Sequence, residues 1–383
     1  MHILRYSDKL NRMIRQDTPE DLGKPTRPIV EQSMQEGRVE DAKQWLDYLF
    51  QEIAGIQYLL SVWSWYMVQY ILERKTEYNL ELILKESVAP WIGVSAGLRE
   101  QQVASLKIEN DLAKLDVRGL NWRIYLRQVE KRFFLTLDTP QAQDVRRSEW
   151  QLAIHDAMDA GHFEQFKLLL DQRMAEELII HDILCDWVWA LMTLIAREWG
   201  EASLGDVQRA TEEPWIKVRY EKIRDITPEE SLQLSVEAHR GHLAGPRRDG
   251  SVQVIDEPER YVIHLEQCGS GSRMTRGDPI VGNGSRLEPP FNFINIQGAY
   301  EWTWFRNDVC GYCTHCAIVN QILPIEWLGR PMRGTRYPDH PNLPCEWYIY
   351  KTPEAVPDEA YTSVGKKPPE RKKQADISEE FAG

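Results

Sequence analysis

The chain has 383 residues, of which 42% are hydrophobic and 27% charged, as is usual for a globular protein with two or three domains. Its formal net charge of −13 argues against sequence-independent binding to nucleic acid or to an anionic membrane. No run is long enough for a transmembrane helix, and residues 1–15 do not follow the signal-peptide pattern. We therefore predict a cytoplasmic protein that binds neither nucleic acid nor membranes.

An internal repeat occupies much of the first two thirds of the chain. Residues 33–92 align without gaps with residues 157–216, and 17 of these 60 positions are identical. Apolar residues at three- and four-residue spacing predict two helices in the first copy, from Val39 to about Arg74 and from about Leu80 to Val88. We predict that the two copies pack as one antiparallel helical bundle, joined by a charged connector over residues 111–143.

The second copy carries titratable residues that the first copy lacks. Glu177, His181 and Cys185 are spaced four residues apart, which places them on one face of a helix. A polar helix edge, with its histidine bonded to a neighbouring acid, is one interpretation. The alternatives are a second metal site or a wall that faces a substrate. In either alternative, these side chains face the last third of the chain rather than water.

The last third mixes helix and strand signals. In chain order, its predicted elements are a helix over 231–243, a hairpin of 252–255 and 260–266, a loop over 276–290, a helix from about 313 to 323 that Pro324 kinks or ends, and a closing strand over 345–350. We do not expect a helix directly after Cys268.

These signals predict an α+β protein, with a duplicated N-terminal helical bundle and a C-terminal mixed α/β domain that holds a cysteine metal site. The predicted domains are 1–124 for copy one with its connector, 125–230 for copy two, 231–355 for the cysteine-rich ligand-binding domain and 356–383 for a disordered tail.

Half of the six cysteines fall within seven positions. Cys310, Cys313 and Cys316 recur every third residue, and Cys268 starts a glycine-rich turn. Thiolates are the usual ligands of zinc and of iron–sulfur clusters, whereas a disulfide between such close cysteines would be strained. We predict that these four cysteines bind Zn²⁺, with a [4Fe-4S] cluster as the alternative. Buried or redox-active free thiols are the remaining interpretation.

Several further residues are candidates for chemistry on a substrate. Histidine titrates near neutral pH, so proton transfer is assigned to histidines first. The candidate catalytic residues are His315, His264, His242, His181 and the acid Glu266. The candidate substrate-binding residues are Arg273, which would hold a carboxylate by two hydrogen bonds, Trp302, Trp304 and Glu177.

Three short motifs occur in a recognisable order: Gly311-Tyr312, Leu328-Gly329-Arg330 and Cys345-Glu346-Trp347. With them, residues 251–351 resemble the small-molecule-binding 4-vinyl reductase domain, to which proteins similar to L-2-amino-thiazoline-4-carboxylic acid hydrolase look related. The resemblance implies a mixed α/β domain with an enclosed pocket for an organic ligand. In sensor members, cysteines and an acid near the final strand hold zinc. Only Cys345 matches such a position, and the cluster at 310–316 departs from the pattern.

Three functions are compatible with these patterns. The first is a metal-dependent hydrolase or lyase that acts on a small cyclic or aromatic organic acid, with a thiolate-bound metal as Lewis acid. The second is an iron–sulfur redox or electron-transfer protein, because the spacing of the three cysteines is closer to that of ferredoxins than to that of zinc fingers. The third is a small-molecule-binding sensory module whose helical repeats form a homodimer surface.

Overall fold

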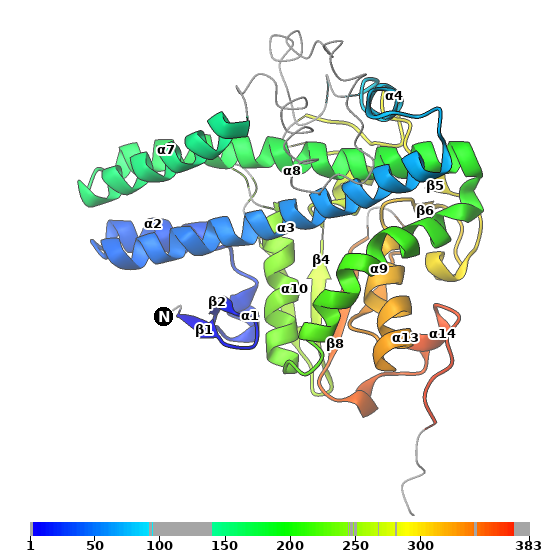
Figure 1. Ribbon diagram of the computed structural model, residues 1–383. Helices are drawn as coiled ribbons and strands as arrows, with labels where there is room; N and C mark the ends of the chain where they lie inside the picture. Colours follow the sequence, from blue (N-terminus) through cyan, green and yellow to red (C-terminus); the bar gives the residue numbers. More distant parts are fainter. Residues whose placement is uncertain are drawn as a thin grey trace, which may run out of the picture.

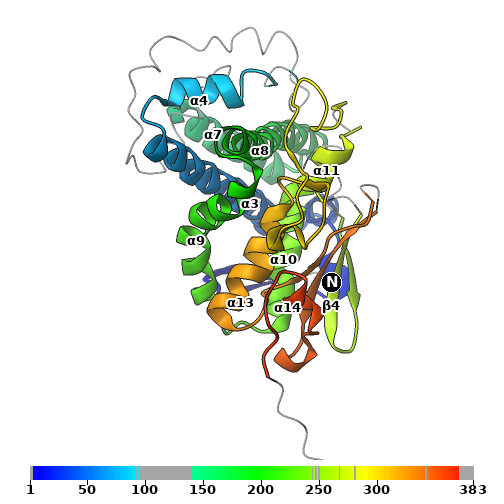
Figure 2. The same ribbon diagram turned by 90° about the vertical axis from the view of Figure 1, so that its right-hand side faces the viewer.

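The computed structural model describes residues 3–91, 94, 140–243, 245, 248, 251–266, 268–279, 282–340 and 343–370. Helices and strands are mixed, and the fold class is α+β. Long helices form one layer, and a small sheet with its covering helices lies beneath it (Figures 1 and 2). Most of the predicted connector, residues 111–139, lies outside the described residues.

The two copies of the repeat contain matching helices. The helices are α2 (Arg27–Gln35), α3 (Val39–Arg74) and α4 (Leu80–Ser87) in copy one, and α7 (Pro140–Asp159), α8 (Phe163–Trp199) and α9 (Leu204–Lys222) in copy two. Both helices predicted for copy one are confirmed. The copies differ at their ends, because α4 ends before Pro90 whereas α9 continues through Pro214. This extension buries Ile216 and Tyr220.

The same turn joins the first two helices of each copy. Gly37 and Gly161 have φ angles of 73° and 67°, the left-handed conformation that commonly ends a helix. Each glycine donates its N–H to the carbonyl of a methionine three residues back, over 3.1 Å to Met34 and 3.0 Å to Met158. Each copy is therefore a helical hairpin whose turn depends on glycine.

Replacing Gly161 with alanine should destabilise the protein by about 1 kcal/mol, because a side chain strains the left-handed backbone. No atom within 4 Å of the new methyl group adds a clash. Gly55→Ala, in the middle of α3 and equally unobstructed, should instead stabilise by up to about 1 kcal/mol through helix propensity. Chemical denaturation measures both changes. If both substitutions changed the free energy of unfolding in the same direction, the turn would not depend on the left-handed conformation of Gly161.

The long helices of the two copies run in the same direction (Figure 1). Gln57 of α3 donates to Glu177 of α8, and further along both helices Lys75 donates to Glu198 over 2.7 Å. The prediction of one antiparallel bundle is therefore wrong for the packing between copies. Antiparallel packing is satisfied within each hairpin, which leaves the equivalent apolar faces of α3 and α8 to pack against each other.

A four-stranded antiparallel sheet has the order β3-β4-β8-β7. Its strands are β3 (Gln253–Asp256), β4 (Arg260–Leu265), β7 (Gly334–Arg336) and β8 (Cys345–Tyr350). The predicted hairpin and closing strand are confirmed. Helix α10 (Pro228–Leu243) covers one face of the sheet, where Val236 packs with Ile263 and Ile349 (Figure 2).

Shorter elements connect these parts. They are β1 (Leu4–Ser7), β2 (Arg12–Arg15), α1 (Pro19–Leu22), α11 (Gly271–Arg276), β5 (Asn295–Ile296), β6 (Val309–Cys310), α12 (Thr314–Ala317), α13 (Leu323–Leu328), α14 (Glu359–Thr362) and the 3₁₀ turns Glu201–Ser203, Glu301–Thr303 and Pro353–Ala355.

Three local predictions in the last third need correction. Helix α11 follows Cys268, where no helix was expected. Pro324 does not end its helix, which was one of the two effects predicted for it, because a π-helical turn at Ile318–Ile322 joins α12 to α13 and the helix continues past Pro324. Pro324 lies in the first turn of α13, where its missing N–H is least costly. The segment from residue 356 to 365 includes α14 and buries Tyr361 and Val364, so it is not a disordered tail. Residues 371–383 lie outside the description.

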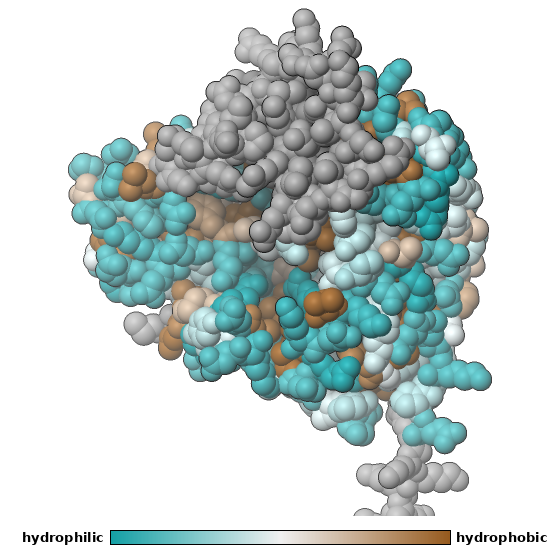
Figure 3. Space-filling model, in the orientation of Figure 1, coloured by the Kyte–Doolittle hydropathy of each residue, from teal (hydrophilic) through white to brown (hydrophobic). Residues whose placement is uncertain are grey.

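The largest cluster of buried apolar residues joins both parts of the chain. It contains residues of α3, α4 and α8 together with Met274, Phe293 and Ile318 of the last third. The prediction that no run is long enough for a transmembrane helix is wrong for α8, which is long and apolar enough to cross a membrane by length and composition. Of the apolar 18-residue window in α8, 89% is buried inside the protein. Hydrophilic residues predominate on the face that Figure 3 shows, and apolar residues form small separate patches there.

Candidate active site

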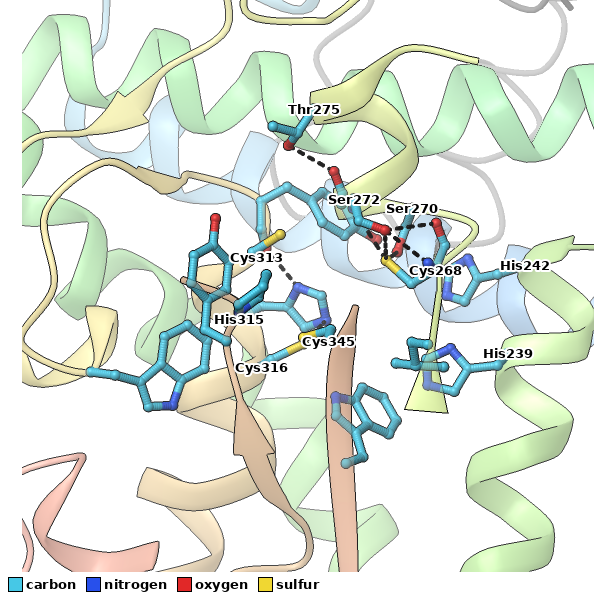
Figure 4. A pocket seen from close by; sticks show the side chains of 17 residues that line it. His239, His242, Cys268, Ser270, Ser272, Thr275, Cys313, His315, Cys316 and Cys345 are labelled. Carbon is cyan, nitrogen blue, oxygen red and sulfur yellow. Dashed lines mark hydrogen bonds between the residues drawn. The ribbon is translucent and has the colours of Figure 1, made fainter. Parts of the chain in front are cut away.

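A cavity of about 60 Å³ lies among α10, the end of β4, the start of α12 and the start of β8. Four thiols and three imidazoles line it, and Figure 4 shows them around the same space. They belong to Cys268, Cys313, Cys316, Cys345, His239, His242 and His315. Three of the four predicted metal ligands are therefore in this cavity, and Cys345 is present in addition.

Strand register and close backbone packing bring the segments together. Leu265 is the register partner of Cys345, so the start of β8 lies beside the end of β4, three residues before Cys268. A Cβ atom on Gly269 would lie 2.2 Å from the carbonyl oxygen of His242, and one on Gly271 would lie 2.3 Å from Cys313 Sγ. Side chains at these glycines would force the turn away from the cavity.

Hydrogen bonds reach the sulfur of Cys268 from Ser272. The backbone N–H of Ser272 lies 3.2 Å from Cys268 Sγ and its hydroxyl lies 3.3 Å away. Donors of this kind stabilise a thiolate. Burial, by contrast, raises the pKa of the Cys316 and Cys345 thiols, so that they are protonated when nothing is bound.

Cys310 does not line the cavity, although it was predicted as a ligand. It lies in β6, where pairing with Asn295 of β5 turns it into the core, and it is 1% exposed. Burial tends to raise its pKa, but hydrogen bonds from Cys313 and Thr275 outweigh this and lower the pKa. The same hydrogen bond, which Cys313 donates, is the largest cause that raises the pKa of Cys313 well above its ordinary value.

His315 presents a free nitrogen to Cys316. Its Nδ1 lies 2.7 Å from the carbonyl oxygen of Tyr312, which can only accept, so Nδ1 carries the proton. The other nitrogen, Nε2, is then an acceptor, 3.6 Å from Cys316 Sγ. The backbone of the cysteine segment thus determines the tautomer of this imidazole.

His239 is a buried imidazole without a partner. It is 4% exposed, its ring centroid lies 4.3 Å from that of Trp347, and neither nitrogen bonds to any described residue. Burial lowers its pKa to about 3, so the ring is neutral. A buried imidazole with both nitrogens unsatisfied is unusual, and a bound group can supply the missing partner.

His242 is connected to a buried acid through His181. His181 Nδ1 lies 2.8 Å from Asp182 and its Nε2 lies 2.8 Å from His242 Nδ1. Burial is the largest cause that lowers the pKa of both imidazoles, so each carries one proton. Because Asp182 accepts the His181 proton, His242 must donate through Nδ1. Its Nε2 is therefore left as an acceptor on the cavity wall.

Two arginines keep Asp182 ionised. Burial alone would raise the pKa of Asp182, but Arg273, the bond from His181 and Arg248 outweigh it and hold the pKa well below its ordinary value. Arg248 donates to both carboxylate oxygens, over 3.0 and 2.9 Å, and also contacts Asp278. Arg273 lies 3.3 Å from Asp182 and is 2% exposed. Its Nε donates to the carbonyl of Gly269, while Nη1 and Nη2 make no hydrogen bond to a described residue. Arg273 is not among the residues that line the thiol cavity, where it was predicted to hold a substrate carboxylate.

The spacing of ligand atoms differs between two parts of the site. Within the described portion of the chain, three ligating atoms come within 4.8 Å of one another only at His181, Cys185 and His242. Cys268, Cys310, Cys313 and Cys316 therefore do not approach to within roughly 4 Å of one another, as predicted for a shared zinc ion. The alternative prediction, that they bind separate irons of one cluster, stays a prediction. The thiols surround the cavity at wider spacing.

The three residues predicted to share one face of α8, Glu177, His181 and Cys185, contact two different helices. His181 and Cys185 face α10, where His181 bonds to His242 and Cys185 Sγ lies 3.4 Å from His181 Nε2. Glu177 instead bonds to Gln57 of α3 and contacts Arg173. It is thus part of the contact between the two copies and lies outside the thiol cavity.

Other predicted residues also lie outside the cavity. His264 is 3.3 Å from Glu346 on the neighbouring strand, because strand alternation turns it away from Leu265, which lines the cavity. Glu266 is exposed. Trp302 stacks on Tyr300 beside a separate cavity. Trp304 does line the thiol cavity, with its N–H donated to Gln321.

A second chamber of about 110 Å³ adjoins the thiol cavity. The two spaces share Tyr312, His242, His315 and Trp347 as lining residues. Sequence analysis missed this chamber, because most of its remaining walls come from α3 and α9, which carry no metal-ligand motif. The others are Ala238, Val319, Asn320 and Arg333. The spacing of Trp63 and Trp65, repeated at Trp187 and Trp189, was a signal of aromatic packing but not of a cavity.

In comparisons with protein-family models, curated proteins and solved structures, no match to this chain was found. The resemblance of residues 251–351 to the 4-vinyl reductase domain therefore stays a prediction.

Proposed function

We propose that the cavity is the active site of a metal-dependent hydrolase or lyase that acts on a small cyclic or aromatic organic acid. The observation that carries this proposal is the convergence of four thiols and three imidazoles on one enclosed space beside a second chamber. The proposed metal ligands are Cys268, Cys313, Cys316 and Cys345.

The donor set suits a thiophilic metal. Thiolates favour zinc and iron–sulfur clusters over hard cations such as Mg²⁺. All six cysteines are free thiols, so none of the four is lost to a disulfide. Ser272 donates to the sulfur of Cys268, as outer residues commonly do around thiolate ligands. A bound metal would supply Lewis acidity toward a substrate carbonyl or imine.

The general base in this proposal is His242. Its Nε2 is the unprotonated end of a chain that runs through His181 to the ionised Asp182. The positive charge that Nε2 gains on protonation would be stabilised by the ionised Asp182 through the hydrogen bonds of the chain, while Asp182 itself stays ionised. His242 lines both the thiol cavity and the adjoining chamber, so it is placed to take a proton from a substrate or a water molecule.

The spacing of the thiols favours a second candidate, an iron–sulfur redox protein. Sulfurs that share one zinc ion lie about 3.8 Å apart, given Zn–S bonds of about 2.3 Å in a tetrahedron. In a [4Fe-4S] cluster each thiolate binds a different iron, so the sulfurs stand further apart. No three of the described thiols lie within 4.8 Å of one another, which agrees better with a cluster.

Metal analysis and a visible spectrum of the full chain, purified without air, test the proposal. We expect bound metal in at least stoichiometric amount, with a brown colour for a cluster and none for zinc. Cys345→Ser should remove most of the metal, because it deletes a cavity ligand. The matched variant Cys310→Ser should keep it, because Cys310 lies outside the cavity. Less than one metal ion per chain in fresh wild-type protein would contradict the proposal.

Reduction separates the two candidates. A metal centre that dithionite reduces, with a change in its visible spectrum, would support the redox function. A colourless, redox-inert centre would support the hydrolase or lyase with zinc as Lewis acid.

A further inference from the structure

The chamber beside the thiol cavity has aromatic walls. Its lining includes Trp63 of α3, Trp215 and Tyr220 of α9, and Trp347 of β8. Ile56 and Leu60 of α3 complete one side. Such walls suit a flat apolar ligand, because indole rings offer large rigid faces for stacking.

One guanidinium group in this chamber has no hydrogen-bond or ion-pair partner. It belongs to Arg219, which lines the wall and whose side chain bonds to no residue in the described ranges. Burial is the largest cause that lowers its pKa. The neighbouring Arg333 is different, because its Nε donates to Ser235 over 2.6 Å and its Nη1 to Asn320 over 3.0 Å. Arginines away from bulk water are normally paired, so Arg219 is the cation available to a ligand.

Unsatisfied polar groups occur elsewhere on the same wall. Glu212 is fully buried, and neither of its carboxyl oxygens bonds to a described residue. Burial raises its pKa well above the ordinary value, so it is a neutral hydrogen-bond donor. Trp63 Nε1 is likewise buried without an acceptor in the described structure. Buried polar groups are rarely left unpaired, and a polar ligand would satisfy both.

The positions of the two ionisable residues give the chamber a direction. Glu212 and Arg219 are seven residues apart on α9, which is two turns and about 10 Å along the same face. Gln208, one turn before Glu212, donates to Thr314 beside Cys313 over 2.7 Å, so the Glu212 end of α9 lies toward the thiols. Tyr220, next to Arg219, donates instead to the carbonyl of Val319 further along the chain, over 2.8 Å. Arg219 therefore marks the end remote from the thiols.

We infer that the chamber binds a flat organic carboxylate, with the carboxylate on Arg219, the ring between the tryptophans and the reacting end directed past Glu212 toward the thiol cavity. Arginine matches this ligand because its planar guanidinium donates two parallel hydrogen bonds to a carboxylate. The inference deepens the proposed function and rests on it, because this ligand would be the substrate. It assigns the carboxylate to Arg219 in place of Arg273.

Isothermal titration calorimetry of the full chain tests the inference with two probes. trans-Cinnamate is a flat carboxylate, and cinnamamide is its uncharged analogue of nearly the same shape. Wild-type protein should bind cinnamate more tightly than cinnamamide. Arg219→Gln should weaken cinnamate binding roughly tenfold to a hundredfold, the range for lost hydrogen bonds to a charged group, and leave cinnamamide binding unchanged. Arg219→Lys, which keeps the charge but loses the planar fork, should be intermediate.

Arg209→Gln is the matched control. Arg209 lies on the same helix but pairs with Glu326 away from the chamber, so its loss should affect neither probe. Equal cinnamate affinity in wild type and Arg219→Gln, or no cinnamate binding by wild type at millimolar concentration, would overturn the inference.

The same titration distinguishes failure of this inference from failure of the proposed function. Arg219-dependent cinnamate binding in protein that holds no metal would keep the inference while the metal proposal fails. Stoichiometric metal without Arg219-dependent binding would overturn the inference alone.

Discussion

Asp182→Asn should lower the free energy of unfolding by about 3–5 kcal/mol, the cost of removing one partner from a buried ion pair. Asp182 is fully buried and neutralises Arg248 and Arg273, which are 7% and 2% exposed. Asparagine keeps the shape of the side chain but not its charge. Asp278 also contacts Arg248 but cannot neutralise both guanidinium groups. Denaturation with urea, monitored by tryptophan fluorescence, measures the loss.

Asp339→Asn is the control for this prediction. Asp339 pairs with Arg306 over 2.9 Å, but its side chain is 74% exposed, and exposed pairs contribute little. Its removal should change stability by less than about 1 kcal/mol. If both variants lost the same small amount, the network around Asp182 would not be the buried electrostatic core that its contacts describe.

Glu212→Gln should make the protein more stable, by an amount that grows with pH. The pKa of Glu212 in the folded protein lies well above its ordinary value because of burial. Between the unfolded and folded pKa values, the unfolded chain releases a proton that the folded protein keeps. Stability therefore falls as pH rises through this window, by about 1.4 kcal/mol per pH unit. Glutamine cannot ionise, so the variant escapes this loss.

Unfolding free energies measured from about pH 4 to pH 8 check the prediction, since this range begins near the pKa of a glutamate in an unfolded chain. Wild type and Glu212→Gln should be similar at the acid end and diverge as pH rises. Glu221→Gln, at the exposed end of the same helix, should follow the wild-type profile. If the difference in unfolding free energy between wild type and Glu212→Gln did not change with pH, ionisation of Glu212 would not be its cause.

The elements with strong local patterns were predictable from the sequence. The bounds of α3 agree with its apolar periodicity because every turn of that helix buries residues on the same side. The hairpin of β3 and β4 agrees with the alternation of apolar and polar residues, because successive side chains of a strand point to opposite faces of the sheet. Pro324 shows the limit, because a π-helical turn accommodates the proline that local rules place at a helix end.

The candidate site was only partly predictable. The cluster at 310–316 indicated thiol chemistry, but which sulfurs face the cavity depends on the pairing of β6 with β5, a contact that a spacing pattern does not contain. Cys345 joins the cavity through its register with Leu265, eighty residues away in the chain. His181 and His242 form one proton chain because α8 and α10 touch there.

Local sequence thus determined where the helices and strands form and which kinds of reactive side chain the site can contain. The reason is that secondary-structure propensity and the spacing of apolar residues act over a few neighbouring residues. Tertiary structure alone decided which groups meet and which remain unpaired. Arg273 was predicted to hold a substrate carboxylate, but the fold packs Asp182 against it. Arg219 gave no signal in the sequence, and only the fold places its guanidinium in a chamber without an acid beside it. Burial sets the charge state and availability of such groups, and burial is a property of the whole chain.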